Sequence, residues 1–195
     1  MDRIAILASG SGSNAENIAK YLAHSDVARV ASIITNNKSA RVIERAASLG
    51  IPCRVFSRQD FGEGMAVLNS LRDDNITFLV LAGFLQLIPA PIIHAFQGRI
   101  INIHPALLPL HGGKGFYGSR VHQSVIESGA ILSGITIHHV NDRYDEGAII
   151  FQAACHVSRD ETPDSLAEKI HRLEYAYFPV VIEKMLIQLK NSSPV

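Results

Sequence analysis

The sequence has no excess of charge of either sign, and few of its residues are charged. Lys and Arg together number 18, as do Asp and Glu, and these four residue types make up 18% of the chain. Proteins that bind nucleic acid or an anionic lipid surface usually carry a basic patch or stripe. The balanced, scattered charge therefore argues against a nucleic-acid partner and against a membrane-surface partner.

Tryptophan, cysteine and long apolar runs are also scarce. The chain has no Trp, and its two cysteines, Cys53 and Cys155, stand far apart with no Cys/His cluster around either. We therefore expect a reducing compartment, with no disulfide framework and no metal. The opening residues MDRIAILASGSGSN match neither a signal peptide nor a membrane span, so we expect a cytoplasmic protein.

The chain is instead an alternation of aliphatic runs and amphipathic stretches. Its 195 residues suit about one domain of roughly 150 residues, so we expect one domain over 1–190 and a loose tail over 191–195. Strands are predicted over 4–7, 30–34, 53–56, 78–82 and 99–104, and helices over 14–24, 40–49, 65–72 and near Pro89. This alternation predicts an α/β fold with a single doubly wound, mostly parallel sheet.

The pattern changes after residue 104. A loop rich in Pro and Gly precedes a helix over 120–128 and two consecutive strands over 131–140 and 149–157, which we expect to pair as a mixed extension of the sheet. Residues 163–189 have the spacing of one long closing helix. We expect Thr162 at its N-cap, Pro163 at its first position and a kink at Pro179.

A glycine-rich turn, Gly10-Ser11-Gly12-Ser13-Asn14, joins the first strand to the first helix. Glycine lets a backbone approach a ligand closely, and free N–H groups at a helix N-terminus favour an anion, so the turn is a candidate phosphate site. The alternative is a plain turn whose Ser and Asn cap the helix. The second strand ends without the carboxylate typical of NAD sites, although Arg41 leaves an NADP-binding module open.

The strand RIINIHP carries two polar residues on one face. A period of two puts Asn102 and His104 on the same side, about 6–7 Å apart, at the carboxyl end of a late parallel strand. Pro105 restricts His104 to an extended backbone. An amide that donates to an oxyanion beside an imidazole that moves a proton suits acyl transfer. The alternative is that both side chains only satisfy local structure.

Three further polar residues follow in the last two strands and the turn between them. Asp145, in the turn Tyr144-Asp145-Glu146-Gly147, is a weak candidate because acidic residues before Gly are common in turns. His138 and His139 are consecutive in a strand and point to opposite faces, so we interpret both as non-catalytic.

Taken in order, the segments GSGSN, LAGFLQLIP, NIHPALLP, GITIHHV and YDEGAII resemble those of the phosphoribosylglycinamide formyltransferases, which are folate-dependent formyltransferases. The resemblance runs from about residue 3 to the closing helix. It implies a Rossmann-like formyltransferase fold and transfer of a formyl group from the co-substrate 10-formyltetrahydrofolate to the amine of glycinamide ribonucleotide, in purine biosynthesis and without a metal.

The resemblance also implies roles for particular residues. Asn102 would donate to the oxyanion of the tetrahedral adduct, His104 would donate the proton, and Asp145 would stabilise the imidazolium. The 5′-phosphate would be held by Gly12, Ser13 and Asn14. Glu174 would lie near the substrate amine, with a solvated helix charge as the alternative. The folate would lie along Leu85, Gln86, Leu87 and Ile88, facing a turn that includes Asn141 and Asp142.

Two departures from the resemblance are visible. The loop over 110–119 is longer than expected and contains Lys114, and Gln86 stands where an arginine is common. A formyltetrahydrofolate hydrolase is the nearest rival, and a non-enzymatic NADP- or nucleotide-binding regulator is a rival of another class. The balanced charge is compatible with a monomer or a homodimer.

Overall fold

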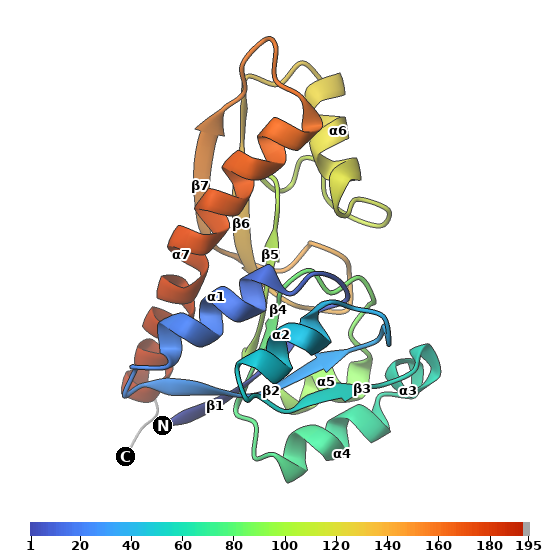
Figure 1. Cartoon of the computed structure of the whole chain (residues 1–195), viewed down its shortest axis with the longest axis vertical. Coiled ribbons are helices and arrows are strands. Elements are labelled where there is room, and N and C mark those ends of the chain that lie inside the picture. The colour runs from blue at the N-terminus through green and yellow to red at the C-terminus, as the bar shows by residue number, and fades with distance from the viewer. Residues whose placement is uncertain (193–195) are drawn as a thin grey trace.

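The computed structural model describes residues 1–192, which are built around one seven-stranded sheet (Figure 1). Its strands in sheet order are β3 (Cys53–Val55), β2 (Ala28–Thr35), β1 (Asp2–Leu7), β4 (Phe78–Leu81), β5 (Ile100–His104), β6 (Leu132–His139) and β7 (Ile149–His156). The pairings from β3 through β5 are parallel, whereas β5–β6 and β6–β7 are antiparallel. The predicted mostly parallel sheet with a mixed extension is confirmed.

Helices cover both faces of this sheet because successive strand residues point to opposite sides. Ile4 and Ile6 of β1 belong to one buried cluster, and Ala5 and Leu7 to the other. The first cluster receives α1 (Ser13–Leu22), α2 (Val42–Ser48), α6 (Ser119–Glu127) and α7 (Pro163–Ser192). The second receives α3 (Arg58–Glu63), α4 (Met65–Asp73) and α5 (Ala90–Ala95). The sheet is therefore doubly wound.

Helix α3 is absent from the sequence prediction. The helix is only six residues long and is held at its start by a capping box. The Asp60 N–H donates to Ser57 Oγ at 3.2 Å, and the Ser57 N–H donates to an Asp60 carboxylate oxygen at 2.7 Å. Local capping and burial of Phe61 outweigh the low helix propensity of glycine.

Helix α7 begins as predicted. It starts at Pro163, and the Ser165 N–H donates to Thr162 Oγ1 at 3.1 Å, as an N-cap residue requires. The helix runs to Ser192, so residues 191 and 192 of the expected tail are helical. Residues 193–195 lie outside the described part of the chain.

Pro179 lies inside α7, where it removes one backbone N–H from the helix ladder. The carbonyl that this N–H would reach, four residues earlier, is that of Tyr175. It accepts instead from Asn17 Nδ2 of α1 at 3.0 Å. The proline therefore frees a hydrogen-bond acceptor that ties the last helix to the first, while the kink itself stays a prediction.

The strand order reverses between β1 and β4, which are neighbours in the sheet although β2 and β3 separate them along the chain. Open α/β folds bind ligands at such a point, beyond the carboxyl ends of the strands. The glycine-rich turn follows β1 and the segment 82–88 follows β4, so both lie at this crevice. Within residues 1–192 the structure has no helix long and apolar enough to cross a membrane.

Candidate active site

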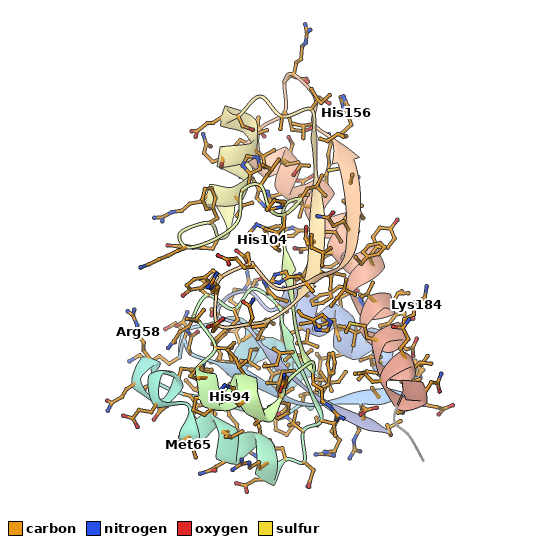
Figure 2. All side chains as sticks on the ribbon, turned by 180° about the vertical axis from the view of Figure 1, so that it is seen from behind. Arg58, Met65, His94, His104, His156 and Lys184 are labelled. Atoms are coloured by element: carbon orange, nitrogen blue, oxygen red, sulfur yellow. The ribbon has the colours of Figure 1, made fainter. Side chains whose placement is uncertain are left out.

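A cavity of about 620 Å³ opens at the carboxyl ends of the central strands. The glycine-rich turn forms one part of its wall, and Asn102 and His104 at the end of β5 form another. The segment after β4, the loop after β5, α6, the β6–β7 turn and α7 complete it. Figure 2 shows His104 near the middle of the molecule, with Arg58, Met65 and Lys184 at its outer surface.

The glycine-rich turn presents a helix N-terminus to this cavity. Gly12 is the N-cap of α1 with φ +73°, and no side chain caps the helix. A Cβ at Gly12 would overlap the side chain of Val42 as well. The turn is therefore not the plain Ser/Asn-capped turn, and its first N–H groups are left for a ligand.

Asn14 and Glu174 bring the first and last helices together beneath this turn. Asn14 Nδ2 donates to a Glu174 carboxylate oxygen at 2.8 Å, while Asn14 Oδ1 is buried without a partner. Glu174 is 6% exposed, so the solvated-charge interpretation of this residue is wrong. Burial raises the pKa of Glu174, against the opposing effects of the Asn14 hydrogen bond and of His171. The result is a buried polar pair that lines the cavity.

Asn102 faces His138, a residue predicted from the sequence to be non-catalytic. The antiparallel register pairs Asn102 directly with His138, and Asn102 Nδ2 lies 3.1 Å from His138 Nε2. His138 Nδ1 lies 2.8 Å from the His139 carbonyl oxygen and must donate to it, which leaves Nε2 of the neutral ring as an acceptor. One Asn102 N–H therefore points to His138, and the other stays available.

His104 lies between two acceptors. Its Nε2 is 2.8 Å from the carbonyl oxygen of His111, and its Nδ1 is 3.5 Å from Asp145 Oδ2. Because Nε2 must donate to the carbonyl, the neutral ring turns its Nδ1 lone pair toward Asp145. Burial lowers the pKa of His104, while the Asp145 charge and the His111 carbonyl oppose that shift. If Nδ1 were protonated, the Asp145 carboxylate would stabilise the resulting imidazolium.

Asp145 joins the site through the β6–β7 turn. One carboxylate oxygen accepts the Gly113 N–H at 2.9 Å, and the other lies 3.6 Å from His138 Nε2. Burial would raise the pKa of Asp145, but the imidazolium forms of His138 and His104, together with the Gly113 N–H, hold it below its ordinary value. The residue has φ +58°, a conformation that non-glycine residues seldom adopt. The turn therefore holds a charged carboxylate between two imidazoles.

The family of the chain follows from its match to known sequences. Residues 2–182 match the formyl transferase family, which is nearly the whole chain. The chain belongs to this family.

Proteins named as phosphoribosylglycinamide formyltransferases resemble it over most of its length. It is 34% identical to phosphoribosylglycinamide formyltransferase of Bacillus subtilis, covering 95% of each chain. It is 41% identical to the chloroplastic enzyme of that name from Arabidopsis thaliana over 92% of its own residues, which span 64% of the plant protein. The crystal structure of phosphoribosylglycinamide formyltransferase from Bacillus halodurans superposes with a TM-score of 0.89, at 33% identity and 98% coverage of each chain.

The segment expected to lie along the folate in this formyl transferase lines the cavity, as does Asn141. Leu85 and Leu87 are 50% and 38% exposed there, so they offer apolar surface to a ligand. Gln86, in place of the common arginine, is bonded on both sides, since Asn36 Nδ2 donates to its Oε1 and its Nε2 donates to the Arg58 carbonyl, each at 3.2 Å. Asp142 is exposed and is not part of the cavity wall.

The cavity wall also contains residues that the sequence did not single out for the site, among them the histidines His122, His138 and His171. The antiparallel register that places His138 beside Asn102 was the missing information, because period two alone gives a face but no partner. Burial, with help from His171 and His104, lowers the pKa of His122 to about 4. Lys114 also lines the cavity, on an exposed stretch of the enlarged loop.

Arg41 does not face this cavity. It lines a separate hollow of about 390 Å³ between α1 and α2, together with Glu16 and Arg45. Arg41 is therefore not placed to bind a phosphate in the main cavity, which removes the support for an NADP-binding module. Within residues 1–192, no three His, Cys, Asp or Glu side chains are grouped so as to hold a metal ion.

Proposed function

We propose that this protein transfers the formyl group of 10-formyltetrahydrofolate to the amine of glycinamide ribonucleotide, in purine biosynthesis. The observation that supports this most is the single cavity that joins an anion-ready helix N-terminus to Asn102, His104 and Asp145. Membership of the formyl transferase family and the similarity to phosphoribosylglycinamide formyltransferases agree with it.

In this proposal the ribonucleotide binds along the wall formed by the glycine-rich turn and α7. The N–H groups of Gly12, Ser13 and Asn14 receive its phosphate, because they begin α1 and have no acceptor in the helix. Glu174 accepts a hydrogen bond from the substrate amine and orients its lone pair. The folate lies against Leu85, Gln86, Leu87 and Ile88, with the turn that holds Asn141 and Asp142 opposite.

The chemical step begins when the amine nitrogen attacks the formyl carbon. A C–N bond forms, and the carbonyl oxygen becomes an oxyanion that accepts the free Asn102 N–H. His138, which accepts the other Asn102 N–H, holds the amide in this orientation.

Collapse of the adduct then breaks the bond between the formyl carbon and N10 of the folate. The amine loses one proton and N10 gains one, so the net proton count is unchanged. His104 carries this proton, and Asp145 stabilises the imidazolium while it exists. Each step uses side chains of this chain, so we expect no metal to be required.

We further propose that residues 1–190 act as one formyltransferase domain, since every strand of the structure belongs to one sheet within residues 1–192. The expected cytoplasmic location belongs to the same proposal, although the relative from Arabidopsis thaliana is named as a chloroplastic protein.

The deciding experiment is a pair of assays with 10-formyltetrahydrofolate, with and without glycinamide ribonucleotide, in which release of tetrahydrofolate is followed in the presence of EDTA. We expect release only with the ribonucleotide. Equal release in both would favour a hydrolase that uses water as acceptor. Tight dinucleotide binding with no release in either would favour a regulator, and activity lost to EDTA would contradict the metal-free mechanism.

A further inference from the structure

The carbonyl oxygens of residues 9–12, at the start of the glycine-rich turn, all accept hydrogen bonds from residues that are not part of the cavity wall. Asn37 Nδ2 donates to the Ser9 carbonyl at 3.3 Å, the Val42 N–H to the Gly10 carbonyl at 3.2 Å and the Glu16 N–H to the Gly12 carbonyl at 2.9 Å. The remaining carbonyl, that of Ser11, accepts from Arg45 Nε at 2.9 Å. A peptide unit whose oxygen is fixed on one side turns its neighbouring N–H groups to the other.

Two of these four hydrogen bonds come from side chains, those of Asn37 and Arg45, and only Arg45 is charged. Its guanidinium also forms an ion pair with Glu16, which stands in the first turn of α1 and is shared with Lys20 at 2.6 Å. A carboxylate in that turn competes with an anion for the positive end of the helix. The guanidinium therefore both fixes the Ser11 carbonyl and offsets the charge of Glu16.

Arg45 cannot act by touching a ligand in the main cavity. It lines the separate hollow between α1 and α2 and is not part of the cavity wall. Any effect on phosphate binding must pass through the backbone of the turn and the local field.

We infer that Arg45 is a positioning residue for the phosphate of the ribonucleotide, which it serves by turning the Ser11 carbonyl away from the anion and offsetting Glu16. This inference rests on the proposed function, in which the turn receives that phosphate. It predicts an effect on phosphate affinity that is separable from the chemical step.

The test compares wild-type protein with Arg45→Gln and measures four quantities: kcat, KM for glycinamide ribonucleotide, KM for the folate, and the inhibition constant of inorganic phosphate competing with the ribonucleotide. In the variant we expect the ribonucleotide KM and the phosphate constant to rise together by about tenfold, as loss of one charge-assisted hydrogen bond implies. We expect kcat and the folate KM to stay within about twofold. Arg72→Gln, an exposed change on α4 across the sheet, should leave all four unchanged.

A double variant separates the two parts of the inference. In Glu16→Gln/Arg45→Gln the charge is balanced again, but the Ser11 carbonyl lacks its donor, so we expect phosphate affinity to remain several-fold weak. Full recovery would overturn the positioning role. If Arg45→Gln fails to fold, as judged by circular dichroism, the same measurements are made on Arg45→Lys, which keeps the charge but loses the planar fork.

Failure of this inference can be told apart from failure of the proposed function. If phosphate competes in wild type but equally well in Arg45→Gln, the inference is wrong and the phosphate site stands. If phosphate does not compete with the ribonucleotide in the wild-type protein, both the phosphate site and the inference about Arg45 are wrong. If wild type transfers no formyl group, the proposed function itself fails.

Discussion

Asp145 places one carboxylate against two imidazoles, and its charge is what distinguishes it from an ordinary turn residue. In Asp145→Asn the Gly113 N–H keeps an acceptor, but the charge that stabilises an imidazolium at His104 is lost. We expect kcat to fall by about 10²–10⁴, the usual contribution of an oriented acid or base, with little change in either KM.

The same substitution has a spectroscopic consequence. The Asp145 charge currently opposes the lowering of the His104 pKa by burial, so its removal should move the His104 titration to lower pH. Nuclear magnetic resonance of the histidine ring protons measures this directly. An unchanged titration together with unchanged kcat would contradict the role given to Asp145.

His122 provides a prediction about stability. Its pKa is about 4 in the folded protein and 6.5 ordinarily. Between pH 4 and pH 6.5, His122 is therefore protonated in the unfolded chain but neutral in the folded protein. The folded state is therefore favoured above pH 6.5 and loses that advantage as the pH falls toward 4. Urea unfolding at pH 7 and pH 5 should show a smaller loss for His122→Gln than for wild type. Equal losses of unfolding free energy in the two proteins would contradict a lowered pKa of His122 in the folded state.

At the residue scale, local sequence patterns predicted some of the site residues. Asn102 and His104 were found because they share a strand and a period of two, and the glycine-rich turn because it is contiguous. Asp145 was promoted only by resemblance, since its partner His104 lies on another element. His138 was set aside because its role depends on the antiparallel register with Asn102, which no local pattern contains.

Among the connecting elements, the β6–β7 turn depends on a close approach of two backbones. A Cβ at Gly147 would overlap the His139 carbonyl oxygen, and Gly147 is two residues from Asp145. We expect Gly147→Ala to lose about 1–3 kcal/mol of folding free energy, as overpacking typically does, and to lower kcat by displacing Asp145. Thermal unfolding and steady-state kinetics test both.

The matched control is Gly62→Ala in α3, where an added Cβ meets nothing within 4 Å. Alanine is the better helix former, so stability should stay level or rise by about 0.5–1 kcal/mol, with kcat unchanged. If the two variants behaved alike, steric contact at Gly147 would not be the cause.

The contact between α1 and α7 at Pro179 predicts a coupling. Asn17→Ala should cost about 0.5–1.5 kcal/mol, because the Tyr175 carbonyl loses its donor. In a Pro179→Ala background the restored N–H can reach that carbonyl, so the same substitution should cost less. A double-mutant cycle from urea unfolding measures the difference, and additive effects would show that the two residues are not coupled.

Elements with strong periodicity were predicted to within a few residues, including α7 and its Pro163 start. Helix α3 was not predicted, because its six residues are too few to show a helical period and depend on a capping box for their start. The pairing of β6 with β7 was predicted from two consecutive strands joined by a turn, and the structure shows that it is antiparallel. Elements are thus predictable where one local signal dominates.

For the molecule as a whole, the continuous sheet predicts one cooperative unfolding event. Circular dichroism and tyrosine fluorescence should report the same midpoint on heating, since strands β1 to β7 share one sheet. Glycinamide ribonucleotide at 100 times its dissociation constant should add about 2.7 kcal/mol to the unfolding free energy. Two separate transitions, or a stabilised part beside an unaffected one, would contradict a single domain.

The hydrogen bond between Asn14 and Glu174 joins residues separated by 160 positions in the chain. During synthesis, at about 5–20 residues per second, the glycine-rich turn leaves the ribosome many seconds before α7 exists. The wall that would hold the ribonucleotide is therefore completed only once the residues of α7 have been made. A chain cut short before α7 would display the glycine-rich turn and the Asn102–His104 strand without the Glu174 carboxylate, so this wall of the cavity would be unfinished.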